Sequence, residues 1–278
     1  MKTLIQVEQL KPILQQTQVR VFDCRFSLQN PSAGLRAYER GHIAGAMFAD
    51  MNQDLSTPHI PGVTGRHPLP DRQAWINKVR NWGLDPESLI VMYDDTGGTG
   101  AARMWWMLKW IGHENAVVLD GGWQAWQAVG GDVATAQPKA RAATADNYSQ
   151  LAPLVQLVSA TDIDSDMQLL LDARDAVRFR GEADPIDPVA GHIPGAQCSP
   201  YTGNLREDLK LKSGEELREK FSDVAHTFLQ VVCYCGSGVT ACHNVLAIAH
   251  AGLTLPALYA GSWSEWITDP AHPVATGA

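Results

Sequence analysis

Hydrophobic positions in this chain come in short, largely apolar runs, separated by longer stretches of mixed polarity. The runs are "VRVFDC", "SLIVMYD" and "AVVLDG" in the first half, and "MQLLLDA", "LQVVCYC" and "PALYAG" in the second. A strand that is apolar on consecutive positions is buried on both faces, which is typical of parallel sheets. Helix-like stretches such as "ARMWWMLKWIG" and "GEELREKFSD" lie between the runs. The pattern predicts an α/β fold whose mostly parallel sheets carry helices on both faces.

Three segments of the first half recur in the second half in the same order. The pairs are "VFDCR" and "LLDAR", "GHIAGA" and "GHIPGA", and "LDGGWQAW" and "YAGSWSEW". Nearly equal separations over three motifs predict two tandem copies of one module, over residues 1–133 and 154–278. The stretch 134–153, "ATAQPKARAATADNYSQLAP", has no apolar periodicity and is predicted to be a linker.

Charge and composition narrow the class of function. The 278 residues carry a formal net charge of -8 and no run of Lys or Arg, so a nucleic-acid partner is not expected. The first residues lack the continuous apolar region of a signal peptide, and no stretch is apolar for long enough to cross a membrane. Five cysteines, an odd number scattered over the chain, suit free thiols in a reducing compartment. A cytoplasmic protein acting on small molecules is expected.

The stretch "CYCGSGVTACH", residues 233–243, carries the strongest chemical signal. It joins a predicted strand to a predicted helix, the place where parallel sheets hold ligands. Gly236 and Gly238 would let the backbone take positive φ and turn tightly, so that successive N–H groups converge. A Cys235 thiolate would lie in that turn and at the positive end of the following helix, and both effects lower the pKa of a thiol. The sequence therefore predicts a seat for an anionic sulfur.

The other cysteines have simpler interpretations. Cys24, Cys198 and Cys242 are expected to be small buried hydrophobic residues. Cys233 could form a C-x-C metal or redox pair with Cys235, but no second Cys or His pair with zinc spacing follows. No metal and no organic cofactor is predicted.

These motifs together resemble the two-domain rhodanese family of thiosulfate and 3-mercaptopyruvate sulfurtransferases. The resemblance covers nearly the whole chain and includes both "GHIxGA" segments, "GSWSEW" and the "CGSGVT" loop. It implies that the second module is catalytic and that Cys235 takes sulfur from a donor as a persulfide and passes it on. It also implies that backbone amides cradle that persulfide, and the expected donors are Gly236, Ser237, Gly238, Val239 and Thr240.

The first module has an aspartate, Asp94, where the second has Cys235. A carboxylate cannot act as a sulfur nucleophile, so the first module is predicted to be catalytically inactive. Related cysteine phosphatases use a similar cysteine loop and are an alternative within this fold. They need a longer loop closed by an arginine six positions after the cysteine, and here that position is Ala241.

The sulfur donors of the family are anions and need cationic partners. The resemblance places the substrate-binding role on Arg178, with Arg180 as a weaker candidate. The uncharged residues after Cys235 are typical of the mercaptopyruvate enzymes, in which the serine, here Ser237, hydrogen-bonds the donor or relays a proton. In "GRHPLP", Arg66 and His67 could add positive charge and complete a relay.

Two departures from the mercaptopyruvate pattern leave the donor open. A second arginine is usual where this chain has Asp187, and the relay carboxylate is replaced by Asn52 with Asp50 and Asp54 beside it. The loop favours 3-mercaptopyruvate, and thiosulfate is the alternative. A thiol or cyanide is the expected acceptor, and a thioredoxin-like reductant is a candidate partner. A persulfide carrier without efficient turnover is a further alternative.

Several residues of types that often occur in active sites are predicted to be structural here. His42 and His192 each belong to one of the two "GHI" segments. Because the module without the catalytic cysteine has such a histidine too, both are expected to fix the turn before a strand. The same argument applies to Asp172 and Arg174, which match Asp23 and Arg25. The tryptophans of "RMWWMLKW" have helical spacing and are expected to pack against other hydrophobic residues.

Overall fold

The computed structural model describes residues 2–139, 142–227 and 230–278, and for 223–227 the backbone alone. Two compact units make up the chain. Unit 1 comprises Met1–Thr57, Leu69–Leu154 and Glu207–Leu211. Unit 2 comprises Pro58–Pro68, Val155–Arg206 and Lys212–Ala278. Each unit contains its own five-stranded sheet.

The main sheet of unit 1 is parallel throughout. In sheet order its strands are β1 (Leu4–Ile5), β6 (Ala116–Leu119), β5 (Leu89–Tyr93), β2 (Val19–Asp23) and β4 (Met47–Phe48). A small antiparallel pair is formed by β3 (His42–Ile43) and β7 (Val133–Ala134). The interior strands β2 and β6 are buried at every position, as their largely apolar runs predict.

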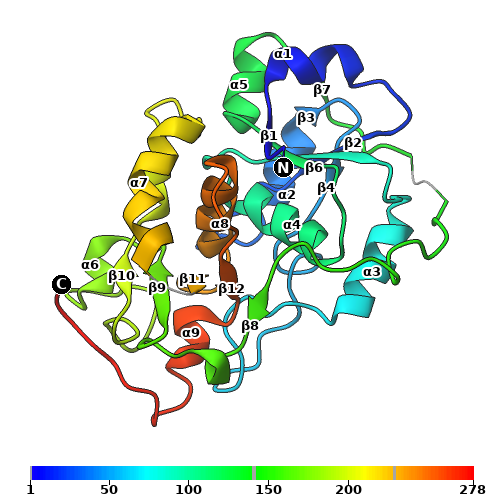
Figure 1. Ribbon diagram of the computed structural model, residues 1–278. Helices are drawn as coiled ribbons and strands as arrows, with labels where there is room; N and C mark the ends of the chain where they lie inside the picture. Colours follow the sequence, from blue (N-terminus) through cyan, green and yellow to red (C-terminus); the bar gives the residue numbers. More distant parts are fainter. Residues whose placement is uncertain (1, 140–141, 228–229) are drawn as a thin grey trace. The chain divides into compact units, whose positions relative to one another are not determined.

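Helices cover both faces of this sheet. They are α1 (Val7–Leu10), α2 (Ala33–Arg40), α3 (Arg72–Asn81), α4 (Thr99–Trp110) and α5 (Gly122–Ala128), with the 3-10 turn η1 (Lys11–Ile13). One core joins α1 and α5 to the face formed by Val21, Tyr93 and Leu119. On the other face Phe22 packs against Trp82, which follows α3. Figure 1 shows α1 and α5 on one side of the strands and α3 and α4 on the other.

Unit 2 repeats this design. Its sheet is also parallel, in the order β10 (Gln197–Cys198), β9 (Gln168–Asp172), β11 (Gln230–Tyr234), β12 (Ala257–Tyr259) and β8 (Leu157–Val158). Its helices are α6 (Ala176–Phe179), α7 (Gly214–Thr227), α8 (Thr240–His250) and α9 (Ser262–Trp266), with the 3-10 turns η2 (Ala160–Asp162) and η3 (Tyr201–Asn204). Figure 1 shows α7 and α8 on one face and α9 on the other, where Trp263 and Trp266 pack on Val232 and Tyr259. The predicted α/β class with mostly parallel sheets is confirmed.

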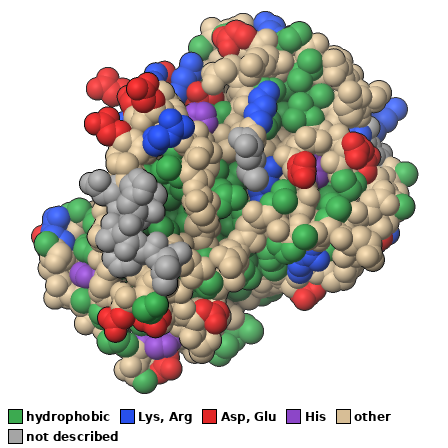
Figure 2. Space-filling view, in the orientation of Figure 1, with side chains coloured by type: hydrophobic (Ala, Val, Ile, Leu, Met, Phe, Trp, Pro, Cys, Tyr) green, Lys and Arg blue, Asp and Glu red, His purple; other side chains and the backbone are tan. Residues whose placement is uncertain are grey.

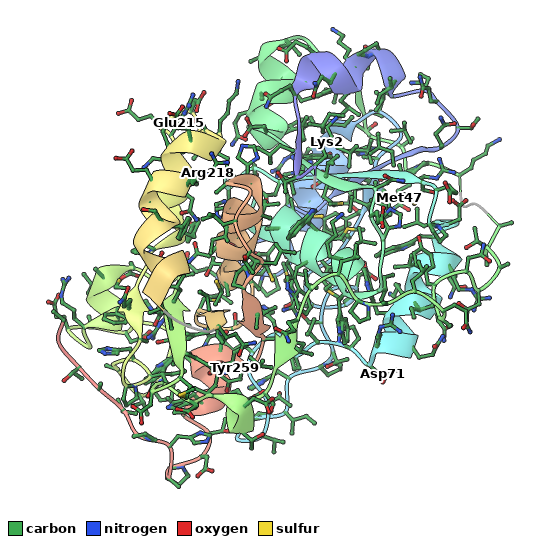
Figure 3. The ribbon with its side chains drawn as sticks, viewed as in Figure 1. Lys2, Met47, Asp71, Glu215, Arg218 and Tyr259 are labelled. Atoms are coloured by element: carbon green, nitrogen blue, oxygen red, sulfur yellow. The ribbon has the colours of Figure 1, made fainter. Side chains whose placement is uncertain are left out.

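Acidic side chains gather at the start of α7. Figure 2 shows acidic side chains gathered there, and Figure 3 labels Glu215 and Arg218 on this helix. Ser213 Oγ accepts the Glu216 amide at 3.2 Å, and the Glu216 carboxylate accepts the Ser213 amide at 2.8 Å, which is a capping box. Arg218 donates to the Ala251 carbonyl, which follows α8, at 2.7 Å. The polar face of α7 is thus fixed by its own cap and by α8.

Unit composition differs from the predicted domains at two segments. The predicted boundaries, 1–133 and 154–278, follow the chain linearly, whereas residues 58–68 pack in unit 2 and residues 207–211 pack in unit 1. The predicted linker, 134–153, includes residues 140–141, which lie outside the described part. Its later portion is held on unit 1: the Thr144 amide donates to the Arg80 carbonyl at 3.1 Å, and Tyr148 is fully buried.

A buried ion pair follows the first long strand in both units. Arg25 Nη2 lies 2.6 Å from Asp23 and also donates to the Gly41 carbonyl at 2.7 Å. The equivalent distances for Arg174, Asp172 and the Gly191 carbonyl are 2.6 and 2.7 Å. These pairs tie each strand to its "GHI" turn, which supports the predicted structural role of all four residues.

The two "GHI" histidines are also used structurally. His42 Nδ1 bonds the Tyr38 carbonyl at 2.8 Å, and the two rings stack 3.8 Å apart. His192 Nδ1 bonds the Phe179 carbonyl at 2.7 Å and stacks on the Phe179 ring at 3.8 Å. Trp105 and Trp106 of α4 are fully buried, as expected.

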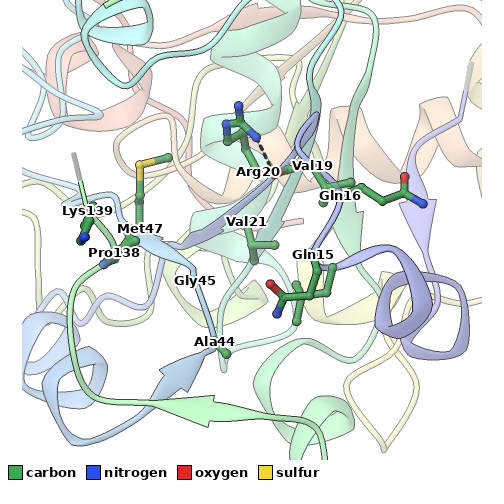
Figure 4. A pocket seen from close by; sticks show the side chains of 11 residues that line it. Gln15, Gln16, Val19, Arg20, Val21, Ala44, Gly45, Met47, Pro138 and Lys139 are labelled. Carbon is green, nitrogen blue, oxygen red and sulfur yellow. Dashed lines mark hydrogen bonds between the residues drawn. The ribbon is translucent and has the colours of Figure 1, made fainter. Parts of the chain in front are cut away.

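A cavity of about 390 Å³ opens beside β2 in unit 1 (Figure 4). Its lining includes Gln15, Val21, Met47 and Lys139, and none of the predicted site residues. Arg20 also borders it, and its guanidinium is turned to the backbone, donating to the Val19 carbonyl at 2.9 Å. No helix in the described part of the chain is long and apolar enough to cross a membrane.

Candidate functional site

The turn between β11 and α8 holds Cys235 in a closed network of backbone hydrogen bonds. The Cys235 carbonyl accepts the Trp263 amide at 2.9 Å, and the Gly236 carbonyl accepts the Ser264 amide at 2.9 Å. The amide of Gly238 donates to Cys235 Sγ at 3.1 Å, and Cys235 is only 2% exposed. A thiol here is largely withdrawn from water and has an N–H group aimed at its sulfur.

Gly238 is one of five predicted cradle donors. For the amides of Gly236, Ser237, Val239 and Thr240 the orientation toward a persulfide stays a prediction. Thr240 is the first residue of α8, so the sulfur precedes the start of an 11-residue helix. The positive end of that helix and the Gly238 amide both favour a negative charge on the sulfur.

The two glycines of the turn serve different purposes. Gly238 has φ +75°, and a Cβ there would lie 2.2 Å from the Ala260 carbonyl oxygen, so no other residue fits without strain. Gly236, contrary to expectation, is not among the positive-φ residues. A Cβ on Gly236 would instead lie 2.8 Å from Arg66 Nη2 and 3.3 Å from Arg178 Nη2. Its missing side chain leaves room for two guanidinium groups beside Cys235.

The matching turn of unit 1 shows what such a loop binds. Asp94 lies in the position of Cys235, and its carboxylate accepts amides from Thr96 at 2.9 Å, Gly98 at 2.8 Å and Ala101 at 3.0 Å. Its carbonyl accepts the Trp123 amide at 2.9 Å, as the Cys235 carbonyl accepts that of Trp263. The repeated loop is therefore built to surround an anionic group with backbone N–H donors.

The segment Pro58–Pro68 brings two predicted site residues to this turn. The Arg66 amide donates to Ser264 Oγ at 3.0 Å, and a Cβ on Gly65 would lie 2.5 Å from the Gly261 carbonyl oxygen, so the segment packs tightly against the start of α9. His67 is 4% exposed, and its Nδ1 lies 2.8 Å from Ser237 Oγ. The structure thus joins His67 to Ser237, two residues after Cys235.

Arg178 reaches the same turn from α6. The helix begins with a cap in which Asp175 accepts the Arg178 amide at 3.0 Å. The Arg178 guanidinium donates Nε–H to Asp184 at 3.0 Å and Nη2–H to Asp187 at 2.7 Å. Asp187 also pairs with Arg66 Nη1. The position at which the family resemblance predicts a second arginine therefore holds a carboxylate bridging two arginines from different segments.

Asp184 organises this ionic cluster. Its Oδ1 accepts the amides of Ile186 and Asp187, each at 2.9 Å. Burial opposes its ionisation, but those amides and the Arg178 charge hold the pKa of Asp184 below its usual value. A charged Asp184 fixes the turn that presents Asp187.

Other sequence candidates lie apart from the cluster. Arg180 pairs with Glu182 at 2.6 Å on the surface, and both side chains are more than a third exposed, at 38% and 53%. Asp50 accepts the amides of Asn52 and Gln53, and Asp54 pairs with Lys78 at 2.5 Å, so these carboxylates of unit 1 are engaged locally.

Ser262 also contacts the Cys235 turn, although no sequence motif singled it out. It has φ +57°, which is rare for a residue with a side chain, and its hydroxyl accepts the Cys235 amide at 3.1 Å. Comparing the two modules could have identified this residue, because the equivalent position of unit 1 is Gly122, with φ +52°. A serine in a position that suits glycine indicates that its hydroxyl is needed there.

The remaining thiols lack this environment. Burial, followed by nearby carboxylates, raises the pKa of Cys24, which is buried as expected, and of Cys198, which is half-buried rather than buried. Burial also raises the pKa of Cys233, which is fully enclosed in β11. Such thiols stay protonated and unreactive near neutral pH. In the described ranges no three His, Cys, Asp or Glu side chains form a group that could hold a metal ion.

Comparisons with known proteins agree with this picture. The model of the rhodanese-like domain matches residues 6–129 and 155–269. A protein of Pseudomonas aeruginosa named "Probable 3-mercaptopyruvate sulfurtransferase" is 48% identical over 278 residues, covering 99% of this chain and 98% of the relative. "Thiosulfate/3-mercaptopyruvate sulfurtransferase 2" of Arabidopsis thaliana is 31% identical, covering 98% of this chain and 86% of that protein. The solved structure of 3-mercaptopyruvate sulfurtransferase from Leishmania major matches with a TM-score of 0.85 and 35% identity, covering 95% of this chain and 74% of that chain.

Proposed function

The chain belongs to the rhodanese-like family, and we propose that it is a sulfurtransferase that moves sulfur from 3-mercaptopyruvate to a thiol or cyanide through a persulfide on Cys235. The observation that carries the proposal is the Cys235 turn: a buried sulfur accepts the Gly238 amide, and the guanidinium groups of Arg66 and Arg178 lie against the next residue. The thiol is therefore next to the cationic groups that an anionic donor needs.

In the first step the Cys235 thiolate attacks the sulfur of 3-mercaptopyruvate. A sulfur–sulfur bond forms while the donor's sulfur–carbon bond breaks, and the electron pair passes to the donor carbon as an enolate. A proton on that carbon completes pyruvate, and the Ser237 hydroxyl with His67 behind it supplies the proton path. The amide of Gly238 and the start of α8 stabilise the persulfide anion.

In the second step the acceptor attacks the outer sulfur of the persulfide. The sulfur–sulfur bond breaks, its electron pair returns to Cys235 as a thiolate, and the acceptor leaves with the sulfur. Cyanide becomes thiocyanate, and a thiol becomes a persulfide. A thioredoxin-like protein as the final reductant, and a cytoplasmic site of action, stay predictions.

Thiosulfate is the second candidate donor. It would transfer its outer sulfur to Cys235 and release sulfite. Arg66 favours it, because this residue supplies a second guanidinium beside Gly236 without an arginine at position 187. One relative is named for both donors, which agrees with a protein that accepts either.

The test measures thiocyanate production from cyanide with each donor separately. The unaltered protein should form thiocyanate in many-fold excess over its own concentration, mainly from 3-mercaptopyruvate. Cys235→Ser should form none, and the matched control Cys233→Ala, in the strand β11 that precedes the turn, should keep most of the activity. Turnover that survives in Cys235→Ser would contradict the mechanism, and a yield of about one equivalent per chain would favour a sulfur carrier.

A further inference from the structure

Asp187 carries a charge that the proposed reaction does not use. Its side chain is 2% exposed and lies between Arg66 Nη1 and Arg178 Nη2, the two cations nearest to the Cys235 turn. Asp184 adds a second carboxylate, 3.0 Å from Arg178 Nε. Arg174 Nη1 lies 3.6 Å from the same Asp184, and Arg174 is itself paired with Asp172. Three guanidinium groups are thus matched by three carboxylates, and this ionic cluster has no net charge.

The carboxylates also set the direction of the guanidinium groups. Arg178 uses Nε on Asp184 and Nη2 on Asp187, and Arg66 uses Nη1 on Asp187. A Cβ on Gly236 would lie 2.8 Å from Arg66 Nη2, 3.3 Å from Arg178 Nη2 and 3.5 Å from Arg178 Nη1. Arg66 Nε is buried and has no hydrogen-bond partner among the described residues. N–H groups of both arginines therefore lie beside Gly236, and Arg178 Nη2 is within reach of both Asp187 and the turn.

From this geometry we propose that Asp187 selects the sulfur donor by charge, favouring a monoanion over a dianion. The inference rests on the proposed function. A sulfur donor that binds beside Gly236 meets two guanidinium groups whose positive charge is already balanced by carboxylates. The single carboxylate of 3-mercaptopyruvate can use these N–H groups as hydrogen-bond donors. Thiosulfate carries two negative charges, and the second is repelled by Asp187 without a compensating cation.

Asp187→Asn tests this, because it removes one negative charge and keeps the shape of the side chain. The kcat/KM for thiosulfate relative to that for 3-mercaptopyruvate should rise at least about tenfold, since a dianion gains more than a monoanion from the lost repulsion. Glu182→Gln is the matched control. It also removes one carboxylate from the same segment, but from an exposed pair with Arg180, and should leave the ratio unchanged within about twofold.

The donor ratio separates selection from a merely structural role, because a damaged site would lower both activities together. A ratio that stays constant in Asp187→Asn while both donors are used, or that rises equally in Glu182→Gln, would overturn the inference. Thiocyanate from neither donor with the unaltered protein would overturn the proposed function and the inference with it.

A second measurement on the unaltered protein guards against a variant that fails to fold. With the cluster neutral, kcat/KM for thiosulfate should change less than about threefold between roughly 0.01 and 0.15 M ionic strength. Two uncompensated arginines would attract a dianion strongly at low salt. A decrease of tenfold or more over that range would therefore overturn the inference.

Discussion

At the scale of single residues, the proposed proton path at the Cys235 turn depends on one contact between distant parts of the sequence. His67 Nδ1 and Ser237 Oγ are 2.8 Å apart, and both residues are nearly buried. With the imidazole proton on Nε2, Nδ1 accepts the serine hydroxyl and increases its ability to pass a proton. Ser237 is close to Cys235 in sequence, and His67 orients it from the segment 58–68.

Removing either partner should slow the proton step without abolishing donor binding. We expect Ser237→Ala and His67→Gln each to lower kcat with 3-mercaptopyruvate by about 10- to 100-fold and to change KM by less than about threefold. The double variant should lose no more than the worse single variant, because the two residues act as a unit. Steady-state kinetics of the three variants decide this, and losses that multiply would show that the residues act independently.

At the scale of elements, the loop from strand to helix is one design used twice with different anions. In unit 1 the anion is the side chain of Asp94, which accepts three amides and completes the turn permanently. In unit 2 the shorter side chain of Cys235 accepts the Gly238 amide at 3.1 Å, and we expect the turn to hold the outer sulfur of a persulfide as well. The two turns have the same backbone geometry at equivalent glycines, because Gly97 has φ +76° and Gly238 has φ +75°.

Gly236 and Gly238 should respond differently to the same added methyl group. Gly238→Ala should lower the free energy of unfolding by roughly 3 kcal/mol, because its positive φ and the Ala260 carbonyl both oppose a Cβ. Gly236→Ala meets the flexible end of Arg66 instead, so stability should change by less than about 1 kcal/mol while KM for the donor rises. Urea unfolding together with donor kinetics tests the pair, and equal stability losses would contradict this account.

At the scale of the whole molecule, the repeated architecture could be predicted because apolar runs and repeated motifs are visible in short stretches of the sequence. The sequence could not predict which segments change units. Pro58–Pro68 has few apolar residues, and its place is set by contacts such as the Arg66 amide with Ser264, nearly two hundred positions away. The same applies to Asp187. Its identity was plain from the sequence, but its two arginine partners appear only in the fold.

The acid stability of unit 1 should depend on His113. Its Nε2 lies 3.0 Å from the Ser88 carbonyl and its Nδ1 3.0 Å from the Tyr148 hydroxyl, which suits a neutral ring. Burial, helped by the charge of Lys109, lowers the pKa of His113 from 6.5 to about 4. Between these values the unfolded chain binds the extra proton, so stability falls as pH falls through this window.

We expect the depressed pKa of His113 to lower the free energy of unfolding by about 3 kcal/mol as the pH falls from about 6.5 to 4. Urea unfolding at pH 7, 5.5 and 4 measures the loss. In His113→Gln, which cannot take up a proton, the decline over that window should be smaller by about that amount. An identical decline in both proteins would assign the acid sensitivity to other groups.

The membership of Pro58–Pro68 in unit 2 has a consequence for inheritance. A gene that arises by duplication can usually lose an idle copy by deletion, since the active copy is encoded intact elsewhere. Here a deletion of the first half would also remove the codons for Arg66 and His67, which contact the turn of the second half. With the proposed roles of Arg66 and His67, selection on sulfur transfer would therefore preserve the reading frame of the copy that lacks the cysteine.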